Sequence, residues 1–309
     1  MITIQENIPL APLTTFKIGG SARYFAAVMS DEDVMEALQY AKEHRLRVFV
    51  LGGGSNVLFS DAGFDGLIIK CENKEITASG TTVTVGAGAM LADVVSFAGK
   101  NGLAGIELMA GIPGSVGGAT RGNAGAFGVE IGSLVTTVTF LDTKTLKAQT
   151  IAREDCEFSY RQSFFKKNTY LLVLSVELVL TQGNVEEIQR IAAETIAKRE
   201  AKHPQNIACA GSFFMNPLVS NPKLLEEFAQ DTGALSRDGK LPAGWLIDHV
   251  DLRGKRVGGA QVSDIHPNYI INTGNATAED ILILASIVKQ RVRTQLGIEL
   301  KEEAHLVGF

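Results

Sequence analysis

The sequence has no run of lysines or arginines and no apolar stretch of the ~18 residues that a membrane-spanning helix needs. With 29 basic and 34 acidic residues the formal net charge is −5, which argues against a nucleic acid or an anionic membrane as a partner. Residues 1–10 lack the basic and apolar regions of a signal peptide. We therefore expect a cytoplasmic protein that binds no nucleic acid and inserts into no membrane.

Cysteines are few, and the common catalytic motifs are missing. The three cysteines, Cys71, Cys156 and Cys209, have no metal-ligand spacing, and their odd number suits reduced thiols better than disulfides. We expect no metal site. The chain also lacks a Walker A sequence, an H-E-x-x-H pair and a G-x-S-x-G elbow. A Rossmann fingerprint is excluded because Val57 stands where its third glycine would be.

Glycine, by contrast, is abundant and clustered. It accounts for 32 of 309 residues, about 10% against a usual ~7%. The clusters lie at 52–54, 111–118 and 122–125, with serine and asparagine interleaved. One such cluster is as well explained by tight turns as by ligand binding. Three together favour an extended cradle in which backbone N–H groups bind phosphates and a ring system.

The order of apolar and polar residues predicts an α+β protein without regular βα alternation. Strands are expected near 23–29, 47–51, 66–70, 81–85, 136–142, 147–151, 170–180, 256–262 and 269–272. Helices are expected after Ser30, which fits a helix N-cap with Asp33 three residues on, and at 91–100, 185–202, 222–229 and 278–296. Residues 1–18 and 110–132 show no period and are expected to be loops. Pro204 interrupts the 185–202 helix pattern, so we place a domain boundary near it.

Spaced motifs then identify a family. They are PLTTF at 12–16, LGGGSNVL at 51–58, GIPGSVGGA at 111–119, YRQS at 160–163, AGSFF at 210–214, AGWLID at 243–248, SDIH at 263–266 and EE at 302–303. In this order they resemble the UDP-N-acetylenolpyruvoylglucosamine reductase family, flavoenzymes of peptidoglycan precursor synthesis, over nearly the whole chain. The short link between residues 180 and 185 matches the version of the family without an extra tyrosine-bearing loop.

The resemblance implies a two-lobed FAD-binding domain of the vanillyl-alcohol-oxidase (PCMH) type, followed by a C-terminal α+β substrate-binding domain. The expected division is residues 1–70 for the first lobe and 71–203, joined by 303–309, for the second. Residues 204–302 would form the substrate-binding domain. We also expect a monomer.

The activity implied by the resemblance is reduction of the enolpyruvyl group of UDP-N-acetylglucosamine enolpyruvate to UDP-N-acetylmuramate. NADPH would be the electron donor and non-covalent FAD the cofactor. Arg161 matches the residue that stabilises the enolate, Ser212 matches the proton donor and Glu303 matches the third catalytic position. Because Glu302 is adjacent, the local strand period should point the two carboxylates to opposite faces.

Binding residues also follow from the match. The positions expected to hold FAD are Gly52, Gly53, Gly54, Ser55, Asn56, Gly111, Ile112, Pro113, Gly114, Ser115, Gly117, Gly118, Asn123, Gly125 and Ala126. Those expected to contact the UDP-sugar are Tyr160, Lys202, Asn216 and His266. Two positions depart from the family: Met215 replaces a usual lysine and His305 a usual arginine. We expect weaker diphosphate affinity from the first and pH-sensitive activity from the second.

The sequence disfavours three other functions. An oxygen-using oxidase of the same flavin superfamily is disfavoured because the substrate-domain motifs match as well. A catalytically inactive FAD-binding or nucleotide-binding regulator would not need Arg161, Ser212 and Glu303 together. A scaffold protein is disfavoured because the sequence has no repeat or coiled-coil pattern.

Overall fold

The computed structural model describes residues 2–203, 207–236 and 238–309, and the chain forms two compact units. The first unit comprises Ala22–Gly54 and Asp65–Ala201, together with the N-terminal residues up to Ile8. The second comprises Pro9–Ser21, Ser55–Phe64 and Lys202–Phe309. Pro204, where the sequence places a boundary, lies outside the described residues.

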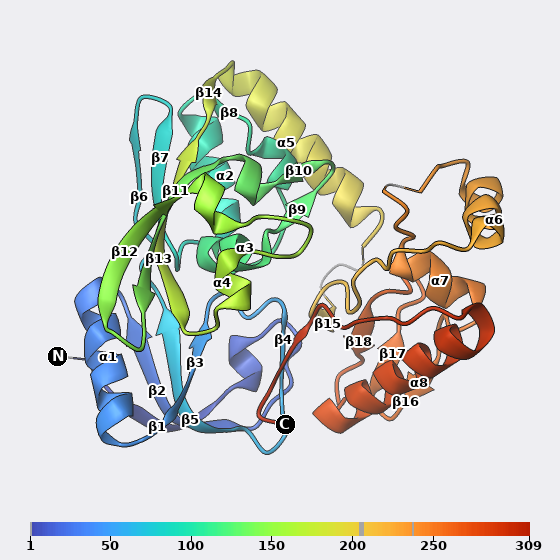
Figure 1. Ribbon diagram of the computed structural model, residues 1–309, viewed down its shortest axis with the longest axis horizontal. Coiled ribbons are helices and arrows are strands. Elements are labelled where there is room, and N and C mark those ends of the chain that lie inside the picture. The colour runs from blue at the N-terminus through green and yellow to red at the C-terminus, as the bar shows by residue number, and fades with distance from the viewer. Residues whose placement is uncertain (1, 204–206, 237) are drawn as a thin grey trace. The chain divides into compact units, whose positions relative to one another are not determined.

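The first unit contains a four-stranded sheet with one covering helix, α1 (Asp31–Glu43). The strand order is β1-β2-β5-β3, with β1 Gln5–Pro9, β2 Ser21–Val28, β5 Phe64–Cys71 and β3 Arg47–Leu51. A capping box between Ser30 and Asp33 begins α1, as the sequence predicts. Val34 and Leu38 of the helix share one buried apolar cluster with Leu67 and Ile69 of β5, and Figure 1 shows the helix beside this sheet.

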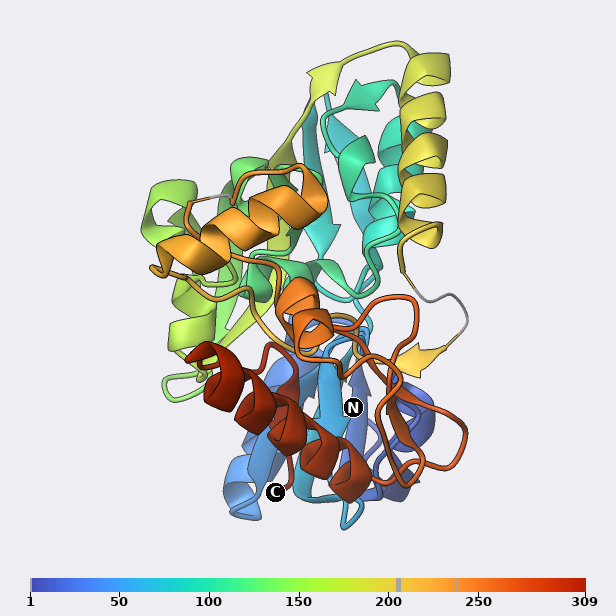
Figure 2. The same ribbon diagram turned by 90° about the vertical axis from the view of Figure 1, so that its right-hand side faces the viewer.

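The same unit contains a five-stranded antiparallel sheet in the order β12-β11-β13-β7-β6. The strands are β12 Lys147–Ala152, β11 Val135–Asp142, β13 Leu171–Val179, β7 Thr82–Gly86 and β6 Ile76–Ser79. The helices are α2 Leu91–Lys100, α3 Val116–Gly122, α4 Phe164–Lys167 and α5 Val185–Glu200. Helix α5 packs against α2 (Figure 2). Short strands complete the unit: β8 Leu103–Ala104, β9 Gly125–Ala126, β10 Val129–Glu130 and β14 Thr181–Gln182.

The second unit is built around a four-stranded sheet and helix α8 (Ala278–Leu296). The strand order is β15-β18-β17-β16, with β15 Ala208–Cys209, β18 Ile270–Asn272, β17 Ala260–Val262 and β16 Arg256–Val257. Strand β4 (Val57–Phe59) pairs in parallel with β19 (His305–Val307), and the remaining helices are α6 Pro222–Thr232 and α7 Ala243–His249. Buried Ile281, Leu284 and Val288 of α8 contribute to the unit's apolar core.

The structure corrects several sequence predictions. Residues 1–18 include β1, and residues 110–132 include α3, β9 and β10 rather than one loop. Helix α3 was not predicted, because its three glycines leave no apolar period in the sequence. The strand expected at 256–262 is a hairpin of β16 and β17. The helix expected to reach residue 202 ends at Glu200. None of the described helices is long and apolar enough to cross a membrane.

Candidate functional site

The first two glycine clusters, distant in sequence, lie against each other in the first unit. A side chain on Gly52 would place its Cβ 2.3 Å from Ser115 Oγ, and one on Gly53 would lie 2.6 Å from the Cα of Gly114. Neither position accepts a Cβ without moving its neighbour. The missing side chains therefore let two loops meet as one backbone surface.

A lysine supports this surface. Lys70, at the end of β5, is half-buried, and its ammonium group donates a hydrogen bond to the carbonyl oxygen of Gly52. Burial lowers the pKa of Lys70 because desolvation disfavours its charged form. A positive charge held beside a glycine loop favours an anionic ligand there.

Several N–H groups of the second cluster are engaged inside the protein. Those of Val116 and Gly117 donate to the carbonyl oxygens of Ala89 and Ala87 at 2.8 and 2.9 Å. The Gly118 N–H donates to Ser115 Oγ, which caps α3. These glycines build the loop itself, and their assignment to FAD stays a prediction.

Asn123 joins the third cluster to the turn that carries Tyr160 and Arg161. It is 1% exposed and ends α3 in the left-handed conformation, with φ of 43°. Its Nδ2 donates to Ser159 O at 2.9 Å and to Glu130 Oε2 at 2.7 Å. Its Oδ1 accepts from the Gly132 N–H at 3.0 Å. One buried amide thus ties the end of α3 to residues 130–132 and to the turn at Ser159.

Arg161 lies beside the third glycine cluster. Ser159 and Gln162 exchange two backbone hydrogen bonds, so Tyr160 and Arg161 form the tip of a tight turn. Arg161 Nη2 donates to Gly125 O at 3.3 Å, and its Cζ lies 5.0 Å from the Tyr160 ring centroid. The structure therefore brings the predicted enolate-stabilising cation to a predicted FAD loop.

In the second unit, Ser212 and Glu303 lie on neighbouring backbone segments. The Glu303 N–H donates to Phe213 O at 2.8 Å, and the Met215 N–H donates to Lys301 O at 2.9 Å. Ser212 directly precedes the paired residues and follows Gly211, whose φ is 72°. Long-range pairing thus brings together two residues that the sequence could relate only through the family.

Glu302 points its carboxylate at helix α8, where Lys289 Nζ donates to it at 2.8 Å. Glu303 has a different local environment, because Asn56 Nδ2 donates to its carbonyl oxygen at 3.1 Å. The neighbouring His305 N–H donates to Asn56 O at 3.0 Å. A residue predicted to bind FAD, Asn56, therefore lies next to a predicted catalytic one.

The predicted substrate residues of the second unit lie in three local settings. Asn216 Oδ1 accepts from the Ala243 N–H at 2.9 Å and so caps α7. The His266 ring stacks on His203, with centroids 5.1 Å apart. Burial, and then the nearby Arg253 charge, lower the pKa of His266, so the ring is neutral near pH 7. Lys202 is exposed in the turn after α5.

The thiols give no sign of a redox or metal role. Burial raises the pKa of Cys71 and of Cys156 to about 11. All three cysteines are free. Within the described ranges, no three His, Cys, Asp or Glu side chains gather in a way that could hold a metal ion.

The sequence patterns did not identify two polar residues that have clear structural roles. Lys70 interrupts the apolar run of β5, a signal that could have been noticed. Asn268 is hydrogen-bonded to Phe214, in the segment after Ser212. Its partners lie more than 50 residues away in sequence, so no local pattern reveals it.

Comparison with known proteins shows which protein family the chain matches. The chain matches the family model described as UDP-N-acetylenolpyruvoylglucosamine reductase, C-terminal domain, over residues 203–307. It matches the model of an FAD binding domain over residues 22–147. The chain therefore contains an FAD-binding domain and has a two-domain α+β fold.

Relatives and a solved structure extend the match to the whole chain. A UDP-N-acetylenolpyruvoylglucosamine reductase of Solibacter usitatus is 40% identical over 308 residues, covering 99% of this chain and 97% of the relative. One of Lachnoclostridium phytofermentans is 38% identical, covering 98% and 92%. The crystal structure of the Thermus caldophilus reductase superposes with a TM-score of 0.78 at 30% identity, covering all of both chains. The chain belongs to the UDP-N-acetylenolpyruvoylglucosamine reductase family.

Proposed function

We propose that this protein is a flavin-dependent oxidoreductase that uses NADPH to reduce the enolpyruvyl group of UDP-N-acetylglucosamine enolpyruvate. The product is UDP-N-acetylmuramate, a peptidoglycan precursor. The observation that carries the proposal is the backbone pairing between Phe213 and Glu303. This pairing places Ser212 and Glu303, the proposed proton donor and its carboxylate partner, on adjacent segments. Family membership supports the same reaction.

The residues of the first unit fit an FAD molecule. The two glycine loops meet backbone to backbone at Gly53 and Gly114, and Lys70 holds a positive charge against the Gly52 carbonyl. Gly54 and Gly114 have φ of 68° and 116°, conformations that let successive N–H groups face one anion. When bound, FAD supplies the hydride that the reduction needs. We place its pyrophosphate at these loops.

Arg161 is proposed to bind the substrate carboxylate. Hydride addition to the terminal carbon of the double bond leaves negative charge on that carboxylate as an enolate. A planar guanidinium stabilises such charge by donating two parallel hydrogen bonds to the carboxylate. The bond from Arg161 to Gly125 O fixes the position of the guanidinium in advance. Charge stabilisation of this kind is usually the largest single contribution to catalysis.

Ser212 is proposed to give its hydroxyl proton to the carbon next to the carboxylate. A serine hydroxyl is a weak acid, so its position and neighbours must assist the transfer. Glu303 is proposed to act beside it, on the same side of the paired segments. Tyr160, Lys202, Asn216 and His266 are proposed to contact the UDP-sugar. The neutral His266 ring would face the nucleotide rather than carry charge to the diphosphate.

The remaining assignments belong to the same proposal. The enzyme is placed in the cytoplasm as a monomer. Its lobes are proposed to be divided at residues 70 and 203. NADPH, rather than NADH, is proposed as the donor on the strength of the family resemblance.

An absorbance experiment tests the proposal directly. The purified protein is kept free of oxygen and titrated first with NADPH, then with the enolpyruvyl UDP-sugar. We expect flavin bands that bleach with NADPH and return with the sugar. Bands that return only when air is admitted would indicate an oxidase instead. A protein without flavin bands, even after FAD is added, would overturn the proposal.

A further inference from the structure

The backbone that follows Ser212 is hydrogen-bonded on both of its edges. On one edge lies the C-terminal segment, whose Glu303 N–H donates to Phe213 O at 2.8 Å. On the other edge no strand is present among the described residues, and the bonds are made by a single residue, Asn268. The segment after Ser212 is therefore held on one edge by the C-terminal segment and on the other by Asn268.

Asn268 reproduces the hydrogen bonds that a neighbouring strand would make. Its Oδ1 accepts from the Phe214 N–H at 3.0 Å, and its Nδ2 donates to Phe214 O at 2.8 Å. Its backbone carbonyl accepts from the Phe213 N–H at 2.7 Å. Asn268 is 3% exposed and Phe214 is 1% exposed. Water cannot replace these bonds in so buried a place, so their loss is costly.

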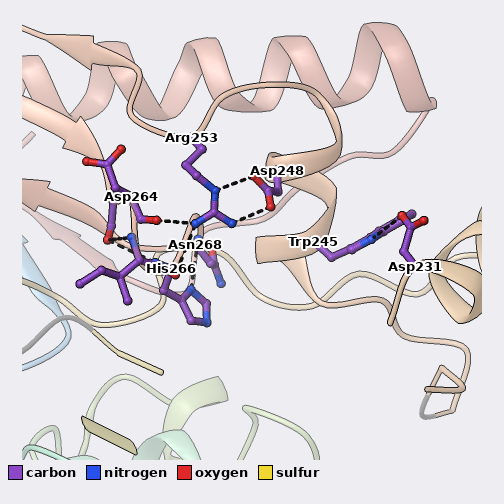
Figure 3. A network of polar contacts seen from close by, with 9 residues as sticks. Asp231, Trp245, Asp248, Arg253, Asp264, His266 and Asn268 are labelled. Atoms are coloured by element: carbon purple, nitrogen blue, oxygen red, sulfur yellow. Dashed lines mark hydrogen bonds and ion pairs between the residues drawn. The ribbon is translucent and has the colours of Figure 1, made fainter. Parts of the chain in front are cut away.

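Asn268 is itself held rigidly. Its backbone N–H donates to His266 Nδ1 at 3.3 Å, and the His266 N–H donates to Ser263 Oγ at 3.3 Å. Arg253 anchors the same loop through its bond to Asp264 O, and Asp248 in turn holds the Arg253 guanidinium by two bonds of 2.6 and 2.8 Å (Figure 3). A side chain with so few degrees of freedom can fix its partner precisely.

We propose that Asn268 is a positioning residue, one that holds the Ser212 segment in register with Glu303 so that the serine hydroxyl can deliver its proton. It touches neither reacting atoms nor cofactor, and acts through the backbone of Phe213 and Phe214. This inference rests on the proposed function, because it assumes the proton donor assigned there. Replacing Asn268 should therefore slow reoxidation of the flavin by the enolpyruvyl sugar and leave the rate of flavin reduction by NADPH unchanged.

Asn272 provides a matched control. It is 8% exposed and equally well bonded: Nδ2 donates to Phe16 O at 3.1 Å, and Oδ1 accepts from Gly274 and Ala276 at 2.8 and 3.0 Å. These side-chain bonds go to other segments than the one after Ser212. Its replacement by aspartate therefore makes the same chemical change in the same unit, without the proposed positioning role.

The test compares Asn268→Asp and Asn272→Asp in the FAD-loaded enzyme by stopped-flow absorbance. In Asn268→Asp, Oδ1 still accepts from Phe214, but the second carboxylate oxygen faces the Phe214 carbonyl. We expect the rate of flavin reduction by NADPH to stay within about twofold of wild type. Reoxidation at saturating enolpyruvyl sugar should fall roughly 10- to 100-fold, the range that a misplacement near 1 Å produces. The solvent deuterium isotope effect on reoxidation should rise as proton delivery becomes limiting.

Asn272→Asp should lower the melting temperature yet leave reoxidation and its isotope effect unchanged. Wild-type reoxidation in Asn268→Asp, or an equal loss in Asn272→Asp, would overturn the inference. If Asn268→Asp does not fold, Asn268→Ala, which places no charge against the carbonyl, is measured against Asn272→Ala with the same criteria. A wild-type enzyme that never reduces the sugar would refute the proposed function, which is a different result.

Discussion

At the scale of single residues, Lys70 combines burial with a bond to the loop that we assign to the FAD pyrophosphate. We predict that Lys70→Met weakens FAD binding by about 10-fold, or about 1.4 kcal/mol, because it removes both the positive charge near the proposed pyrophosphate site and the bond that holds the Gly52 loop. The measurement is a fluorescence titration of the FAD-free protein with FAD. Lys74→Met removes a nearby exposed lysine and is the control. Equal FAD affinity in the two variants would show that Lys70 serves the loop alone.

Sequence reasoning at this scale succeeded where chemistry is local. Ser30 and Asp33 form the expected capping box because all the atoms involved lie within one turn. It failed for Lys70 and Asn268, whose partners Gly52 and Phe214 are brought near only by the tertiary fold. The roles of Arg161, Ser212 and Glu303 came from the family motifs, and they remain predictions.

At the scale of elements, α8 begins with a second capping box. Thr277 Oγ1 accepts from the Asp280 N–H at 3.0 Å, and Asp280 accepts from the N–H groups of Thr277 and Gly259, each at 3.1 Å. These backbone bonds lower the pKa of Asp280 below its usual 3.8. The stability they give is therefore present above pH 3.8 and is lost as the pH falls through the lower folded value.

We predict that Thr277→Ala lowers the free energy of unfolding by about 1 kcal/mol. Asp280→Ala should cost stability at pH 6 and lose most of its effect once acid protonates the carboxylate in the parent protein. Urea unfolding at several pH values measures both variants. Thr294→Ala makes the same threonine change at an exposed position late in α8, where alanine should be neutral or slightly stabilising. A loss from Thr294→Ala equal to that from Thr277→Ala would contradict the capping role.

The sequence predicted best the helices and strands that have a regular apolar spacing and a capping residue. Helix α8 occupies residues 278–296 as predicted, because an apolar stripe follows a threonine cap. Helix α3 was not predictable, because three of its seven residues are glycine. Its shape depends on the Ser115 cap and on bonds from Val116 and Gly117 to Ala89 and Ala87. Ala87 and Ala89 are too far from α3 in the sequence for a local pattern to indicate this helix.

At the scale of the whole molecule, the two units have separate apolar cores. Among the described residues, the buried cluster around α8 contains no member from the first unit, and the clusters around α1 and the five-stranded sheet contain none from the second. The sequence indicated a domain boundary near Pro204, but the interleaved segments of the two units depend on long-range contacts that no local pattern reveals. Separate cores can unfold in separate steps.

The one tryptophan of the chain makes this testable. Trp245 lies in α7 of the second unit, stacked on His249 with centroids 4.6 Å apart, and its Nε1 donates to Asp231 at 3.2 Å (Figure 3). The residues predicted to bind FAD, apart from Ser55 and Asn56, belong to the first unit. Tryptophan emission therefore reports the second unit, and flavin release reports the first.

We predict that free FAD at about 100 times its dissociation constant stabilises the flavin-release transition by about 2.7 kcal/mol, because it binds the folded first unit. The Trp245 transition should move much less in the same urea titration. Trp245→Phe, which removes the emission without opening a cavity the size of the ring, identifies the signal. If both transitions coincide and shift together with FAD, the two cores unfold as one cooperative body, and the ligand stabilises the molecule as a whole.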